Sequence, residues 1–167
     1  SEGHLRADSR VPLGQVLTGV AVRSGTALPD VHTPDALRAA LLAADAIYFP
    51  DPVRATAGIH FANVMRQLGV HDTLLPRFRT FPAGAIAMRE LAADTSANPI
   101  GCTQVTEIKY TPGVQLVGDL PKAFELATVY TAAVRSKAGA PELAARFAAL
   151  LGGEASAALR RDGGFVL

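Results

Sequence analysis

Short apolar runs alternate with helix-like segments along the chain, and this alternation restricts the fold more than any other feature. Apolar runs that fit strands occupy residues 15–23, 45–49, 77–80, 99–105, 113–121 and 125–135. Segments with helical spacing occupy residues 33–44, a stretch from 57 or 58 to 69, and residues 82–93, 140–151 and 154–161. Strands and helices that alternate at this spacing predict an α/β fold with largely parallel strand pairing.

Recognisable end signals mark two of the predicted helices. Thr33 fits an N-cap and Pro34 fits the first helical position. Gly69 fits the C-cap of the helix that begins near Ala57. Asp51, which stands between two prolines just before that helix, indicates a turn. These signals place a loop and then an abrupt helix start directly after a buried strand.

Composition and motifs exclude several classes of protein. The chain has 167 residues, of which 49% are hydrophobic and 19% charged, so it can bury a core. The net charge is +1 and no basic stripe is present, which argues against a nucleic-acid partner. Cys102 is the only cysteine, and the four histidines lack HxxxH or HExxH spacing, so no metal site is expected. Hydrolase, P-loop and dinucleotide motifs are absent, and no cofactor is expected.

Two helix starts rich in small residues are candidate anion sites. A helix N-terminus offers unpaired N–H groups and a partial positive charge, and small residues let an anion approach the backbone. The first start is Thr56-Ala57-Gly58, for which the alternative is a plain helix start with Thr56 as N-cap. The second contains Gly84 and Ala85, after Pro82, for which the alternative is a tight strand-to-helix turn.

Three stretches give the chain a family resemblance. They are "AIYFPDPVRATAGIHFANVMRQLGV", "NPIGCTQVTEI", and "GVQLVGDLP" with the later "TVYTAAV" and "PELAARFAALLGGEASAALRRDGGF". In these stretches the chain resembles the periplasmic solute-binding proteins of ABC transporters, of the molybdate-binding type. The resemblance runs from about Ser9 onward. It implies the type II periplasmic-binding-protein fold, in which two α/β lobes hold a ligand.

The resemblance also implies a division of the chain, with one complete lobe and part of the other. Residues 1–16 would be a remnant of the first lobe and hinge, 17–120 the second lobe, and 121–167 the hinge return and the C-terminal part of the first lobe. The opening part of the first lobe would have no counterpart here. The chain would thus be a C-terminal fragment, and Ser1-Glu2-Gly3 resembles a cut point.

The family's ligand contacts map onto a small set of residues. Its strand-end tyrosine corresponds to Gln104, whose amide can also donate but has a different reach, so the ligand need not be molybdate. Glu107 is expected at a solvated strand end, and His60 either faces the ligand or lies on the surface. The expected ligand-binding residues are therefore Thr56, Ala57, Gly58, Gly84, Ala85 and Gln104.

This resemblance predicts the extracytoplasmic solute-binding component of an ABC importer, which captures a small, molybdate-like oxyanion between two lobes. It would be periplasmic, with a signal peptide upstream, would deliver its ligand to a membrane permease, and would not be an enzyme. Two alternatives stay open. One is the ligand-sensing effector domain of a LysR-type transcription regulator, and the other is an enzyme built on the same scaffold.

The C-terminal helices predict a further property. Leu143, Phe147, Leu150 and Leu151 lie on related turns of the helix at 140–151. In the family these faces pack against the opening part of the first lobe. Without that cover we expect the chain to form a homodimer or to leave residues 126–167 poorly anchored.

Overall fold

The computed structural model describes residues 4–167. The chain divides into two compact units, of which unit 1 comprises Ser1–Val16 and Ala127–Leu167, and unit 2 comprises Leu17–Leu126. The expected cut point at residues 1–3 lies outside the described residues. The chain passes from unit 1 to unit 2 within the long strand β1 (Val11–Arg23) and returns after Leu126.

Unit 2 is built on a sheet with the strand order β3-β2-β4-β1-β5. The other four strands are β2 (Ala46–Pro50), β3 (Phe78–Phe81), β4 (Pro99–Gln104) and β5 (Val114–Asp119). β2 pairs in parallel with β3 and β4, whereas β1 pairs antiparallel with β4 and β5. The predicted α/β fold is confirmed, but the expectation of largely parallel pairing is wrong for β1. A strand covered on both faces is apolar throughout, whichever direction it runs, so its sequence does not report its direction.

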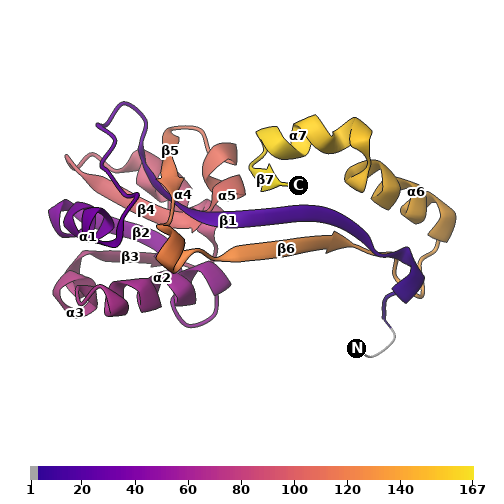
Figure 1. Ribbon diagram of the computed structural model, residues 1–167, viewed down its shortest axis with the longest axis horizontal. Helices are drawn as coiled ribbons and strands as arrows, with labels where there is room; N and C mark the ends of the chain where they lie inside the picture. The colour runs from indigo at the N-terminus through magenta and orange to yellow at the C-terminus, as the bar shows by residue number, and fades with distance from the viewer. Residues whose placement is uncertain (1–3) are drawn as a thin grey trace. The chain divides into compact units, whose positions relative to one another are not determined.

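Helices cover both faces of the unit 2 sheet (Figure 1). α1 (Pro34–Ala43) and α2 (Thr56–Gln67) share a core with Ile47 and Phe49 of β2. α4 (Gly84–Ala93) and α5 (Val105–Tyr110) share a second core with Ala46 and Tyr48. Successive residues of β2 thus enter opposite cores, as the pleat of a strand requires. The short helix α3 (His71–Leu74) follows α2.

Local signals explain some helix ends and miss others. The Thr33 side chain accepts a hydrogen bond from the N–H of Ala36 at 3.1 Å, which confirms the predicted cap of α1. α2 starts at Thr56 itself with Ala55 as its N-cap, so the alternative with Thr56 as N-cap is wrong. α4 starts at Gly84, two residues later than expected. α5 was not expected, because Val105 and Ile108 continue the apolar pattern of β4.

A polar network ties α4 to the sheet beyond the end of that helix. The Tyr48 hydroxyl donates to Oδ2 of Asp94 at 2.8 Å, and the N–H of Ser96 donates to Oδ1 of Asp94 at 2.7 Å. Burial, with the Asp94 carboxylate as a second cause, raises the pKa of Tyr48 to about 12. Burial alone would raise the pKa of Asp94, but the Ser96 N–H and the Tyr48 hydroxyl hold it below its usual value.

Unit 1 contains β6 (Ala127–Ala132), α6 (Pro141–Gly152), α7 (Ala157–Asp162) and β7 (Phe165–Val166). β6 and β7 both pair with β1, and β7 does so through Gln15 and Val16. Arg160 of α7 fastens the unit, since its guanidinium donates to the carbonyl oxygens of Leu13 at 2.6 Å and of Gly152 at 2.8 Å. Both expected C-terminal helices are present, the second of them preceded by a 3₁₀ turn at Glu154–Ser156.

Candidate functional site

The predicted site residues of unit 2 gather at one edge of its sheet. β2, β3 and β4 run in parallel, so their carboxyl ends share an edge, and α2, α4 and α5 start directly after them. The N–H of Asp51, after β2, donates to the carbonyl of Phe81, at the end of β3, at 2.7 Å. Ligands of open α/β sheets bind at this kind of edge. Thr56, Ala57, Gly58, Gly84, Ala85 and Gln104 all lie there, with α2 on one face of the sheet and α4 and α5 on the other.

The start of α2 is shaped by the loop before it. Asp51 accepts hydrogen bonds from the N–H groups of Val53 at 2.8 Å and Arg54 at 3.0 Å, and it pairs with the Arg54 guanidinium at 2.9 Å. The Val53 N–H and then the Arg54 side chain lower the pKa of Asp51. The predicted turn at Asp51 is thus confirmed. No side chain caps α2, whose first residue, Thr56, is exposed.

Gly58 is small for a reason that the sequence did not indicate. It is buried, and a Cβ added there would overlap the carbonyl oxygens of Pro50 and Asp51. Ala57 beside it is also buried. The backbone that approaches Gly58 most closely is therefore that of the preceding loop. This packing lets α2 fold back tightly on β2, and it places the N-terminal turn of α2 at the sheet edge.

The start of α4 is occupied by a carboxylate of the chain itself. The N–H of Ala85 donates to Oε1 of Glu107 at 3.2 Å, and the Thr103 hydroxyl donates to Oε2 of Glu107 at 2.5 Å. A Cβ at Gly84 would overlap both Thr103 and Glu107. The expectation that Glu107 sits at a solvated strand end is wrong, because Glu107 belongs to α5 and is partly buried.

Gln104 and His60 complete the predicted set. Gln104 is the partly buried N-cap residue of α5, and its Cα lies opposite that of Thr18 in β1. The Nε2 atom of His60 lies 2.7 Å from the carbonyl oxygen of Phe124, so this side chain links α2 to the turn before the second chain crossing. Glu107 is the residue that sequence reasoning missed. A Glu three residues after an N-cap is a known feature of helix starts, and this spacing from Gln104 was the available signal.

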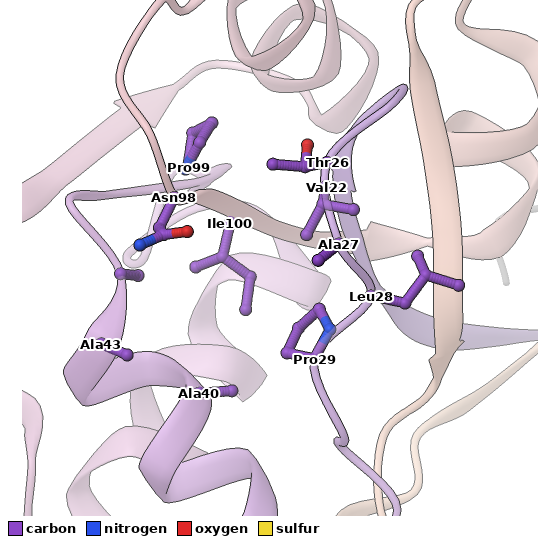
Figure 2. A pocket seen from close by; sticks show the side chains of 11 residues that line it. Val22, Thr26, Ala27, Leu28, Pro29, Ala40, Ala43, Asn98, Pro99 and Ile100 are labelled. Carbon is purple, nitrogen blue, oxygen red and sulfur yellow. The ribbon is translucent and has the colours of Figure 1, made fainter.

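Hollows open on the surface of unit 2, and two of them lie at opposite edges of its sheet. One, of about 380 Å³, lies beside the first turn of α4 and is lined by Ala85, Arg89, Tyr110, Thr111 and Pro112. The other, of about 210 Å³, lies at the amino end of β4, at the edge of the sheet opposite the candidate site, and carries no ionisable side chain (Figure 2). Its lining residues include Val22, Leu28, Pro29, Ala40, Pro99 and Ile100, with Thr26 and Asn98 as polar neighbours.

The described residues show neither of two other kinds of site. Within residues 4–167, no three or more His, Cys, Asp or Glu side chains are grouped so that they could hold a metal ion. In the same part of the chain, no helix combines the length and apolar character needed to cross a membrane. The buried thiol of Cys102 lies in the core under α2, where burial raises its pKa.

Comparisons with known proteins agree on the fold. A family model described as bacterial extracellular solute-binding protein matches residues 1–166. An aconitate isomerase from Pseudomonas sp. is 29% identical over 168 residues, which cover 98% of this chain but only 61% of the isomerase.

The substrate binding domain assigned to a molybdenum ABC transporter from Clostridium difficile is 14% identical, with a TM-score of 0.66 over 98% of this chain and 69% of that chain. The periplasmic molybdate-binding protein of Azotobacter vinelandii is 17% identical, with a TM-score of 0.66 over 99% of this chain and 71% of that chain.

Proposed function

The chain belongs to the bacterial extracellular solute-binding protein family, and from this premise we propose that it captures a small anion at the carboxyl edge of the unit 2 sheet. The observation that carries the proposal is the start of α2. Its N-terminal turn lies at that edge, has no side-chain cap and begins with the exposed Thr56. A helix end of this kind stabilises negative charge through its free N–H groups and its dipole.

In this proposal the protein is the periplasmic binding component of an ABC importer and has no catalytic role. Its ligand is a small oxyanion or carboxylate, held by the N–H groups of the Thr56-Ala57-Gly58 turn, with Gln104 contributing its amide. Ligand capture is followed by a hinge closure that the membrane permease recognises. The exposed side chains of α6 further lead us to propose that the 167-residue chain forms a homodimer.

The aconitate isomerase relative supports a second candidate, in which the ligand is a small organic carboxylate that the protein isomerises. Such chemistry needs an acid or base beside the ligand. Glu107 is the carboxylate of α5 at the candidate edge, and both of its side-chain oxygens already accept hydrogen bonds. This arrangement favours binding over catalysis.

The experiment is a ligand screen. We expect molybdate, tungstate, sulfate, phosphate or aconitate at millimolar concentration to raise the melting temperature by mass action. Incubation with cis-aconitate, followed by NMR spectroscopy, separates binding from isomerisation. A Gln104→Tyr variant should change the order of affinities among the anions that bind. The absence of any shift would contradict anion capture, and an unchanged order would remove Gln104 from the site.

A further inference from the structure

Glu107 is an ionisable side chain held by two separate elements at the candidate edge. Its Oε1 atom accepts the N–H of Ala85 in the first turn of α4, and its Oε2 atom accepts the hydroxyl of Thr103 at the end of β4. Its backbone carbonyl accepts the hydroxyl of Thr111 at 2.7 Å, which secures the far end of α5. The carboxylate is thus held by α4 and β4, and the Thr111 hydroxyl holds the C-terminal end of α5.

This contact gives the two predicted anion sites different electrostatic character. A carboxylate at a helix N-terminus takes the position that a bound anion would take, because it meets the same free N–H groups and the same end of the dipole. Gly84 leaves no spare volume there, since a Cβ at this position would overlap Glu107. α4 therefore already holds its anion, whereas no side chain caps α2.

The charge of Glu107 also bears on any ligand at α2. Both helix starts lie at the carboxyl edge of β2, β3 and β4, so a ligand anion at α2 shares that edge with the negative charge of Glu107. The carboxylate of Asp51, in the loop before α2, is paired with the Arg54 guanidinium at 2.9 Å, whereas the Glu107 carboxylate is held by an N–H and a hydroxyl. Repulsion from this charge grows with each negative charge that the ligand carries. A dianion also cannot distribute its oxygens over two helix ends, because one end is taken.

We propose that Glu107 is a specificity-determining residue, a resident carboxylate that closes the α4 end and lowers the affinity for doubly charged oxyanions relative to singly charged ones. This inference rests on the proposed anion capture at α2. It assigns Glu107 two separable effects: the carboxylate satisfies the N-terminal turn of α4, and its charge discriminates against dianions.

The first effect is tested without any ligand. Glu107→Ala should lower the melting temperature by several degrees, as the loss of a helix cap does in a domain of this size, and 100 mM formate should restore part of that loss relative to chloride at equal ionic strength. Formate supplies the missing carboxylate at the vacated position. Glu90→Ala, which removes an exposed carboxylate from α4 away from its start, and the unchanged chain should show no such difference. An equal rise in melting temperature from chloride to formate in all three proteins would overturn the resident-carboxylate assignment.

The second effect is tested with perrhenate and tungstate, which are tetrahedral oxyanions of closely similar size carrying one and two negative charges. Calorimetry measures both affinities in the unchanged chain and gives the reference ratio. Glu107→Gln, which keeps the side-chain size and an acceptor oxygen, should raise the tungstate-to-perrhenate affinity ratio by about tenfold, the order of magnitude that removal of one nearby charge produces in a partly solvated site. Glu90→Gln should leave the ratio unchanged.

These outcomes separate the inference from the proposed function. If neither anion binds any variant, anion capture at α2 is wrong, and the formate experiment alone decides whether Glu107 fills the α4 end. If the anions bind but the ratio is the same in Glu107→Gln and the unchanged chain, capture stands and the charge discrimination is overturned. If Glu107→Ala does not fold in chloride but folds in formate, the resident-carboxylate assignment is supported. If Glu107→Ala folds in neither salt, the melting temperature of Glu107→Gln is compared with that of Glu90→Gln. Equal melting temperatures of these two variants would overturn the assignment.

Discussion

Units 1 and 2 differ in how far their helices are covered. In unit 2, α2 buries Phe61, Val64 and Met65 completely against the sheet. In unit 1, α6 has the same length but buries only Ala148, while Leu143 and Phe147 remain 65% and 59% exposed. In the described part of unit 1, the buried apolar residues are Val16, Val134, Ala148 and Ala157. Both helices are amphipathic, so amphipathicity identifies a face that needs a partner without identifying the partner.

The contrast matters for function because the candidate site lies on unit 2, whose helices are covered. The N-terminal turns of α2 and α4 are held by the two cores of unit 2, which fix the positions of their N–H groups. A binding site of fixed geometry loses less free energy on ordering than one on a mobile scaffold. Unit 1 instead leaves one apolar face of α6 exposed.

The largest expected effect comes from a matched pair of phenylalanines. Phe61→Ala should lower the free energy of unfolding by about 3–5 kcal/mol, because Phe61 is completely buried. Its ring packs edge-to-face on that of Phe49, with the ring centroids 5.6 Å apart. Phe147→Ala should change the free energy of unfolding by no more than about 0.5 kcal/mol at protein concentrations where the chain is monomeric. Urea unfolding, followed by the reactivity of the buried Cys102 thiol, measures both. Equal losses would show that α6 is covered after all.

Gly58 should give the next largest effect. Gly58→Ala forces a methyl group against the carbonyl oxygens of Pro50 and Asp51 and should destabilise unit 2 by about 1–3 kcal/mol. The control is Gly139→Ala in unit 1, where a Cβ meets nothing within 4 Å. Thermal unfolding of the two variants compares them directly. A Gly58→Ala protein as stable as the Gly139→Ala protein would mean that the loop before α2 moves aside freely.

The exposed face of α6 should produce self-association of the 167-residue chain. Exposed apolar patches of this kind favour pairing, and a symmetric dimer would cover both copies of the face. Light scattering should therefore give a mass that rises with concentration, and Phe147→Lys should reduce this rise. The matched control is Arg146→Lys, which keeps the charge of an exposed residue on the same helix. A strict monomer in which residues 127–167 resist protease would contradict the prediction.

A smaller effect should appear at alkaline pH, where Tyr48 of unit 2 titrates. The pKa of Tyr48 is raised to about 12, from an ordinary value of 10.0, so the folded state keeps this hydroxyl neutral where the unfolded state ionises it. Stability from this group is therefore complete below pH 10 and is lost as the pH rises toward about 12. Tyr48→Phe should flatten this part of the pH profile, while also losing about 1 kcal/mol at neutral pH with the hydrogen bond to Asp94.

Tyr130 of unit 1 provides the comparison for Tyr48. It lies in β6 and stacks edge-to-face on Phe165. Tyr130→Phe keeps that ring contact and is the matched Tyr-to-Phe change in unit 1. Unfolding midpoints in urea between pH 8 and 12 provide the measurement, and an equally steep profile in Tyr48→Phe would assign the alkaline loss to other groups.

Several elements could be predicted because their signals are local. The cap and first residue of α1 follow from Thr33 and Pro34, and the strand β2 follows from an apolar run bounded by a turn at Asp51. The gathering of helix starts at one sheet edge follows from the parallel order of β2, β3 and β4. α5 could not be separated from β4, because Val105 and Ile108 suit a buried strand and a buried helix equally well.

The sequence by itself determined the α/β class, the positions of most helices and strands, and the small residues at the starts of α2 and α4, since each depends on periodicity or on side-chain size within a few neighbours. The tertiary structure alone decided the antiparallel direction of β1, the packing reason for Gly58 and the placement of Glu107 at the start of α4. Those features arise where backbones and side chains from separate elements meet. Local pattern does not encode such meetings, because hydrogen-bond partners and steric overlaps are defined only once the strands have been ordered in the sheet.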